Sequence, residues 1–275
     1  MTVAASDTST RAVATRVSAK TRRVRRTILV WALRVAALVV IVGLWLYGNG
    51  PGHVSSLLLP SLGNVLVFFG QLVVSPAFWS AAWTTLYSMA ISFVVAAVVG
   101  TLIGFWAARG PLRAKVIEPL AVWGYMAPLF LFYPLFLLWF GVGVESKITL
   151  AALSTVFPII YGSLRAFRSV DPVYLRVARA YGASPRQTDW MIKLRATLPL
   201  LGSAFRIGAA YSITTVLAGE VLSSTGGLGY ILAKASQLFN AAGAFAILIA
   251  IVLFVAVLQL GLNRLFTPRH DSRTQ

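Results

Sequence analysis

The chain alternates between long apolar runs and shorter segments rich in charged and polar residues. Six runs approach the length of about twenty residues that a helix needs to cross a hydrocarbon core. They cover residues 28–47, 81–108, 116–140, 148–167, 199–222 and 241–262. A further apolar stretch, residues 59–78, is broken by Pro, Gly, Asn and Gln, so we interpret it as an interfacial helix. The pattern predicts an all-α, polytopic membrane protein with six transmembrane helices.

Composition agrees with a membrane protein. Hydrophobic residues make up 58% of the 275 residues and charged residues only 11%, which a water-soluble surface would not tolerate. The net charge of +17 is compatible with nucleic-acid binding, but the basic residues cluster between apolar runs and form no aromatic-lined basic face. The absence of cysteine excludes disulfides, and His53 and His270 are too far apart in sequence to indicate a metal site.

Lysine and arginine set the expected orientation, because they are retained on the cytoplasmic side during insertion. We expect residues 1–27 to be a disordered basic cytoplasmic tail, residues 28–266 a permease domain, and residues 267–275 a second cytoplasmic tail. With the N-terminus inside, four basic clusters face the cytoplasm, in the N-terminal tail, between the second and third spans, between the fourth and fifth spans and at the C-terminal end, and only Lys147 and Lys234 face outward.

The loop between the fourth and fifth spans, residues 168–198, is longer than a simple connection requires. Asp171 is a suitable N-cap with Pro172 at the first helical position, and Gly182 can end that helix in the left-handed conformation. Ser184 begins a second short helix with Pro185 first and Gln187 at the capping-box position. The apolar stripes of the two helices are Tyr174, Val177, Ala178 and Tyr181, then Trp190, Met191 and Leu194.

Residues 175–184, with the sequence LRVARAYGAS, and the following Ile192 and Leu194 resemble the EAA loop of binding-protein-dependent transport permeases. More of the chain is similar to the nitrate, sulfonate and taurine branch of that family, through RGPLRAKVIEPL, LFLLWFGVGVESKI, FRSVDPVYLRVARAYGAS, LPLLGSAFRIGAAYS and LAGEVLSSTGGLGYIL. The resemblance implies the fold of a type I ABC importer transmembrane domain in the bacterial inner membrane.

In that family the loop forms the coupling helix, which sits in a groove on the ATPase subunit. The resemblance therefore implies an ATP-binding-cassette ATPase dimer, a second permease copy and an extracytoplasmic substrate-binding protein as partners. The residues that would contact the ATPase are Arg176, Val177, Ala178, Arg179, Tyr181, Gly182, Ala183 and Ser184. The implied substrate is a small organic or inorganic anion such as an alkanesulfonate, taurine or nitrate. A thiamine-type pyrimidine precursor or an aromatic acid is the alternative.

Two positions depart from the family pattern. Arg176 replaces the glutamate of the motif, and Arg195 replaces the proline that usually follows its Ile-x-Leu. Because Arg176 inverts the charge presented to the ATPase groove, we expect either an adapted partner or a dissimilar second permease subunit with the standard motif.

Candidate pathway residues lie in the third and fifth spans. The third span carries an uncharged aromatic series interrupted by prolines, which is plausible as a pore lining or as ordinary packing. Arg206 is an intramembrane charge, which favours a function. It has a structural or coupling role near the inner mouth, or it contacts the substrate. The alternative is that its side chain snorkels to the cytoplasmic interface. Glu220 is either an outer-gate carboxylate or a solvated helix end. The candidates are Met126, Phe130, Tyr133, Arg206, Tyr211 and Glu220.

Other classes of function lack support in the sequence. The glycine-rich residues 223–229 lack the Gly-Lys-Ser/Thr ending of a phosphate loop and are interpreted as an external turn. With no nucleotide site, nucleophile–base pair or cofactor motif, we expect no catalysis by this chain and ATP hydrolysis on a partner subunit. A secondary transporter would show internal repeats, which we do not find.

Overall fold

The computed structural model describes residues 28–37, 39–50, 54–55, 58–222 and 225–266. The two tails expected at residues 1–27 and 267–275 lie outside the described residues, as do His53 and His270. The described chain divides into two compact units, residues 1–64 and 65–275.

The first unit contains the helix Ile28–Gly48, which is long and apolar enough to be the first span. The Trp45 indole and the Asn49 amide both donate hydrogen bonds to the Pro60 carbonyl, each over 3.0 Å. These bonds fix the end of the first helix against the segment that leads into α2 (Leu62–Val74).

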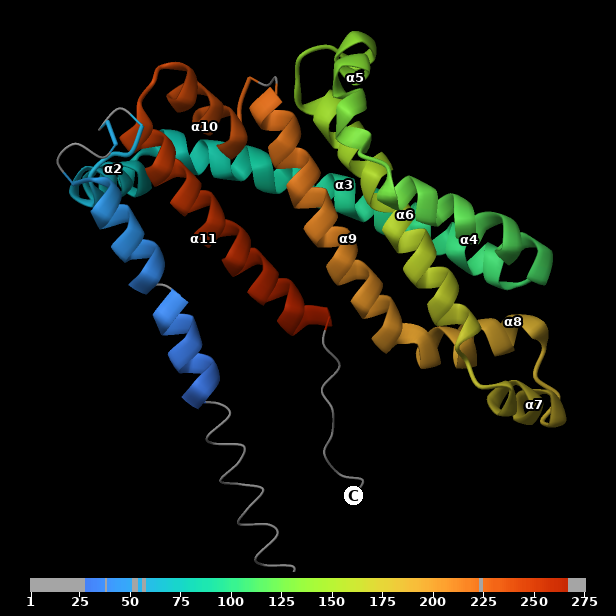
Figure 1. The fold of residues 1–275 in the computed structure, drawn as a ribbon. Coiled ribbons are helices and arrows are strands. Elements are labelled where there is room, and N and C mark those ends of the chain that lie inside the picture. Colours follow the sequence, from blue (N-terminus) through green and yellow to red (C-terminus); the bar gives the residue numbers. More distant parts are fainter. Residues whose placement is uncertain (1–27, 38, 51–53, 56–57, 223–224, 267–275) are drawn as a thin grey trace, which may run out of the picture. The chain divides into compact units, whose positions relative to one another are not determined.

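The second unit is built from helices, with no strand among its described residues (Figure 1). Its long helices are α3 (Pro76–Ala108), α4 (Pro111–Met126), α6 (Val144–Arg168), α9 (Leu194–Leu222) and α11 (Ala241–Phe266). Shorter elements are η1 (Leu129–Phe132), α5 (Tyr133–Phe140), α7 (Pro172–Ala180), α8 (Pro185–Gln187), η2 (Thr188–Lys193) and α10 (Leu228–Gln237).

The expected number of spans is confirmed by length and composition. Among the described residues five helices can cross a membrane, and a bent pair makes six when it is counted as one span. The apolar stretch interpreted as interfacial forms α2, whose 13 residues are too few to span, and α3 begins at Pro76 with Ser75 as its N-cap.

The bent pair corrects the expectation of one regular third span over residues 116–140. Pro111–Met126 and Leu129–Phe140 meet at 73°. The break lies at Ala127, whose ψ of 133° is extended because the ring of Pro128 excludes the helical conformation at the preceding residue. Pro128 also lacks the N–H that a continuous helix would use.

Helices α3, α6 and α9 form the centre of the second unit, and glycines let them approach closely. A Cβ on Gly104 of α3 would lie 2.7 Å from Ser163 Cβ of α6, and one on Gly100 would lie 2.8 Å from Ile159 Cγ2. A Cβ on Gly208 of α9 would lie 2.7 Å from the same Ile159 side chain. Small residues at helix contacts are the usual means of close packing in a membrane, where apolar burial supplies little driving force.

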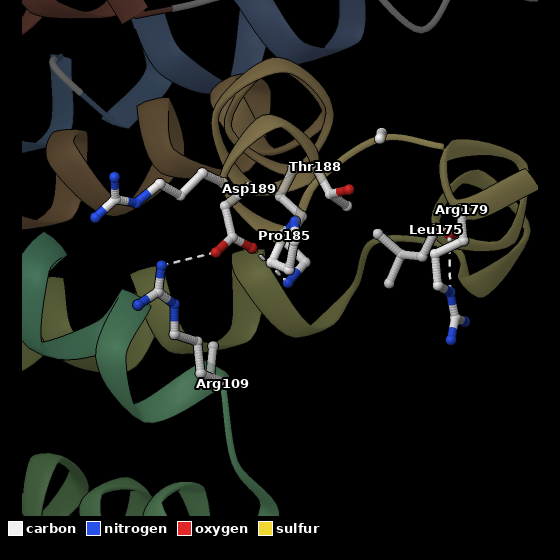
Figure 2. A pocket seen from close by; sticks show the side chains of 10 residues that line it. Arg109, Leu175, Arg179, Pro185, Thr188 and Asp189 are labelled. Atoms are coloured by element: carbon white, nitrogen blue, oxygen red, sulfur yellow. Dashed lines mark hydrogen bonds and ion pairs between the residues drawn. The ribbon is translucent and has the colours of Figure 1, made fainter. Parts of the chain in front are cut away.

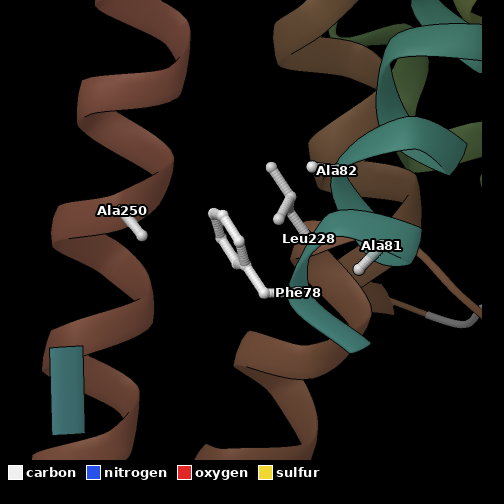
Figure 3. Close-up of a cluster of buried hydrophobic side chains, with 5 residues drawn as sticks. All are labelled: Phe78, Ala81, Ala82, Leu228 and Ala250. Carbon is white, nitrogen blue, oxygen red and sulfur yellow. The ribbon is translucent and has the colours of Figure 1, made fainter. Parts of the chain in front are cut away.

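A second contact joins α3, α10 and α11. Phe78, Ala81 and Ala82 of α3 pack with Leu228 of α10 and Ala250 of α11 in one buried cluster (Figure 3). Helix α10 was not expected, since the segment after the fifth span was interpreted only as a turn. Its signal is the apolar face of residues 228, 231 and 235, which recurs at helical spacing.

The loop between α6 and α9 contains one separate helix instead of the two expected. Helix α7 stands alone, whereas the predicted second helix continues without a break into the fifth span, so that the combined helix is Pro185–Leu222. The transition passes through the π-helical turn η2. Because no glycine or proline separates residues 186–198, nothing in the chain ends the second helix.

Candidate functional site

The loop expected to reach a partner is held by local caps. Asp171 Oδ1 accepts a hydrogen bond from the Val173 N–H over 2.8 Å, and Pro172 opens α7. Gly182 has a φ of +73°, the left-handed conformation that releases the chain after the helix. The N-cap and the glycine stop expected from the sequence are both confirmed.

The start of the next helix carries the expected capping box. Ser184 Oγ accepts from the Gln187 N–H, and the Gln187 side chain accepts from the Ser184 N–H over 2.8 Å. These reciprocal bonds satisfy two donors that the first helical turn leaves open. The position of α8, and with it the end of the loop, is therefore fixed by the loop's own residues.

Asp189 joins the loop to the rest of the second unit (Figure 2). Its carboxylate accepts from Arg109 Nη2 at the end of α3 and from Lys193 Nζ one turn later, each over 2.7 Å. The Asp189 side chain is only 11% exposed. Asp189 precedes the apolar run of the fifth span. Burial alone would raise the pKa of Asp189, but the hydrogen bonds from Lys193 and Arg109 outweigh it and lower that pKa.

Replacing Asp189 by Asn should destabilise the chain by about 2 kcal/mol, because two cations lose the carboxylate that they share. The measurement is the melting temperature of the detergent-purified protein. Glu118→Gln is the matched control. It removes a more exposed pair, Glu118 Oε2 to Arg168 Nη1 at 3.5 Å, which should contribute little. Equal shifts in both variants would contradict the anchoring role of Asp189.

An open hollow of about 680 Å³ lies beside this ion cluster, between α7 and the start of the fifth span. Figure 2 shows Leu175 and Arg179 of α7 on one side and Pro185, Thr188 and Asp189 on the other. Arg109, Arg186 and Lys193 also line it, so with Arg179 four cationic side chains face the single acid, Asp189. The side of α7 that carries Leu175 and Arg179 borders the hollow.

Most of the residues expected to contact an ATPase are exposed. Of this set only Ala178 is buried and Ala183 is half-buried. The exposed members are Arg176, Val177, Arg179, Tyr181, Gly182 and Ser184. Three of the four residues of the predicted apolar stripe, Tyr174, Val177 and Tyr181, form an uncovered surface within this chain, with Tyr181 at 88% exposure. Such an apolar face on a well-capped helix is typical of a site that a partner covers.

A second cavity, of about 400 Å³, lies where the third span breaks. Three of the six candidate pathway residues line it, namely Met126, Phe130 and Tyr211. The Tyr211 hydroxyl donates to the Tyr125 carbonyl over 3.2 Å, across the two helices. The remaining lining residues are small, apolar or hydroxyl-bearing: Gly124, Ala127, Pro128, Leu129, Ser154, Thr214, Thr215 and Ala218.

The other three candidates do not line that cavity. Tyr133 is buried at the start of α5, and Arg206 donates to Ser203 over 2.8 Å, one turn toward the cytoplasmic loop. Glu220 is completely buried and lies 3.3 Å from Lys147 Nζ. The solvated alternative for Glu220 is therefore wrong.

Lys147 was expected to face the outer side of the membrane, and the structure buries its side chain within the chain. The residue belongs to α6 and is 1% exposed. Sequence reasoning placed it between two apolar runs and could not identify its partner, which is 73 residues away. The signal in the sequence was that Lys147 and its partner Glu220 are each an isolated charge at the edge of an apolar run.

Comparisons with known proteins agree with the fold. Residues 100–271 match the family described as binding-protein-dependent transport system inner membrane component. The taurine transport system permease protein TauC of Escherichia coli is 27% identical, over 86% of this chain and 90% of its own length. The putative aliphatic sulfonates transport permease protein SsuC of Bacillus subtilis is 29% identical, over 82% of this chain and 81% of its own.

A solved structure of the MetNI methionine ABC transporter contains a chain of the same fold. Its TM-score is 0.61 at 21% identity, with 70% of this chain and 97% of that chain covered. The type I importer fold expected from the sequence is thereby confirmed.

Proposed function

Because the chain belongs to the binding-protein-dependent transport system inner membrane component family, we propose that it carries a small organic anion, such as taurine or an alkanesulfonate, through the membrane. It is a multi-pass inner-membrane permease subunit of an ABC importer. This membership also decides against the secondary-transporter alternative. The matches to a taurine and a sulfonate permease support the choice of substrate class.

Coupling to a separate ATPase rests on one observation, the uncovered apolar face of α7. Tyr174, Val177 and Tyr181 project from a helix that is capped at both ends. A stable helix with an unsatisfied apolar side fits a groove on another protein. Asp189 in the loop binds Arg109 at the end of α3 and Lys193 directly before α9. The ion cluster would therefore transmit movement of the loop to both helices.

The partner groove would need a particular charge. Arg176 and Arg179 lie on α7 away from the apolar stripe and are exposed, and Arg186 follows on α8. An ATPase groove that accepts this helix would carry carboxylates opposite the arginines. The ATPase of a permease with the motif glutamate would not need them at that place. The alternative is a heteromer in which a dissimilar second permease supplies that glutamate. The composition of the purified complex, with one or two kinds of permease chain, separates the two arrangements.

The cavity at the break of α4 and η1 is our candidate for part of the pathway. Its lining has no charged residue, and Ser154, Thr214 and Thr215 offer only weak polar contacts. Such a surface lets an anion pass without holding it, and leaves selection to the substrate-binding protein. A second permease copy would complete the passage.

We propose that the N-terminus is cytoplasmic, which the basic side chains at one end of the second unit support. Arg109 meets Asp189, and Arg168 meets Glu118 of α4, so the connection between α3 and α4 and the loop after α6, both rich in Lys and Arg, lie together. These loops are cytoplasmic by the distribution of positive charge. Because an even number of spans precedes each of these loops, we infer that the N-terminus is cytoplasmic as well.

The function is tested in liposomes that contain this permease, its ATPase subunit and the binding protein encoded with it. We expect uptake of labelled taurine that needs both ATP and the binding protein. Uptake of a pyrimidine precursor or an aromatic acid in place of taurine would overturn the substrate class but not the importer. Taurine uptake without ATP would contradict the assignment of coupling.

A further inference from the structure

A buried polar network lies at the end of the second unit opposite to α7 and α8 (Figure 1). Lys147 of α6 and Glu220 of α9 form its centre, with side chains 1% and 0% exposed. Lys147 Nζ lies 3.3 Å from Glu220 Oε1 and donates to the Gly226 carbonyl over 2.9 Å. Lys147 therefore holds Gly226, just before α10, as well as Glu220 of α9.

Thr85 extends the network to α3 and α10. Its hydroxyl lies 2.9 Å from Glu220 Oε2 and accepts from the Leu228 N–H over 2.9 Å. The Gly229 N–H donates to Glu220 Oε2 over 3.0 Å. Side chains of α3 and α9 thus satisfy two of the N–H groups that the first turn of α10 leaves open. The position of α10 depends on these two side chains.

The network also borders the candidate pathway. A Cβ on Gly219 would lie 3.4 Å from both Lys147 Cβ and the Tyr133 ring. Tyr133 starts α5, directly after η1, whose Leu129 and Phe130 line the cavity. Gly219, the neighbour of Glu220 in α9, therefore lies close to both Lys147 and the segment that walls the pathway.

We propose that Lys147 and Glu220 are positioning residues that fix α10 and the outer wall of the pathway, so that transport depends on their hydrogen bonds and not only on a folded core. The proposal rests on the proposed function, which supplies the transport to be measured. A buried ion pair often contributes little net stability, and apolar residues of similar volume can replace it. What apolar residues cannot replace are the bonds to Gly226, Gly229 and Thr85.

The decisive variant is the double replacement Lys147→Met and Glu220→Met. It leaves no unpaired charge, so the chain should insert and bind its ATPase like the unmodified protein. We expect taurine uptake in the reconstituted complex to fall roughly tenfold, within the range of measured coupling between sites. Unchanged uptake would show that the pair is only structural and would overturn the proposal.

A cysteine reporter reads the position of α10 without any substrate. The chain has no cysteine of its own. Ala82 is 3% exposed and packs in one cluster with Leu228 (Figure 3). In the Ala82→Cys background, the double Met variant should react several times faster with a water-soluble maleimide. An equal labelling rate in both proteins would contradict the positioning of α10.

Thr85 supplies a matched pair of milder variants, which decides the question if the double Met variant does not assemble. Thr85→Ser keeps the hydroxyl. This variant should therefore retain uptake, and its labelling at Ala82→Cys should stay as slow as without the Thr85 change. Thr85→Val has the same shape without the hydroxyl and should lose uptake and label faster. Identical behaviour of the two variants would overturn the proposal. If the unmodified complex fails to import taurine, the substrate proposal fails while the labelling result still tests the positioning residues.

Discussion

Replacing residues 176–183 by a Gly-Ser segment of equal length should release the ATPase subunit and reduce ATP-driven uptake to background. The replacement removes the second half of α7, its Gly182 stop and the exposed Val177 and Tyr181. It keeps Ser184 and Gln187, so the capping box that begins the fifth span stays intact. Co-purification of the ATPase with the tagged permease, followed by uptake in liposomes, measures the effect.

The control for this replacement is the state of the permease itself. Because the Arg109–Asp189–Lys193 cluster lies outside the replaced residues, the chain should still insert and keep its melting temperature. A single change, Tyr181→Asp, places a charge on the exposed apolar face and should weaken the complex without any loss of backbone. An ATPase that stays bound to both variants would show that α7 is not the coupling helix.

Gly104→Val should destabilise the helical core by about 3 kcal/mol. A Cβ at this position meets Ser163 Cβ at 2.7 Å and the backbone nitrogen of Leu164 at 2.9 Å. Backbone atoms cannot move aside as a flexible side chain can, so α3 and α6 must separate. The measurement is the unfolding midpoint of the purified protein in mixed detergent micelles.

Gly261→Val is the matched control for Gly104→Val. Gly261 lies in α11, and a Cβ there meets no atom within 4 Å. Both changes carry the same intrinsic helix cost, so their difference reports only the contact between α3 and α6. If the two variants unfold at the same midpoint, the close approach at Gly104 does not stabilise the protein.

The features that could be predicted from the sequence are those decided by neighbouring residues. Asp171, Gly182 and Ser184 were identified correctly because a cap needs only the next few residues. The break at Ala127 was not predicted, although Pro128 was noted, since a proline within a span can bend a helix or end it. The outcome depends on the tertiary contacts around it.

The buried pair of Lys147 and Glu220 illustrates what a single sequence does not contain. Each residue alone has the appearance of a charge at a membrane boundary, and the two are brought together only by the packing of α6 against α9. Helix α10 was missed for a related reason. Its first turn is stabilised by Thr85 and Glu220, which are distant in sequence, so the local signal for the helix is short.

The π-helical turn η2 makes the junction between loop and membrane sensitive to the number of residues in it. A π-turn accommodates one residue more than an α-turn, and in α-helical winding each residue rotates the chain by about 100°. Loss of one residue from Thr188–Lys193 would turn the apolar face of α7 by that angle relative to the fifth span. Relatives should therefore tolerate substitutions in this turn far better than insertions or deletions, and the length of the segment is a sharper marker of a working permease than its composition.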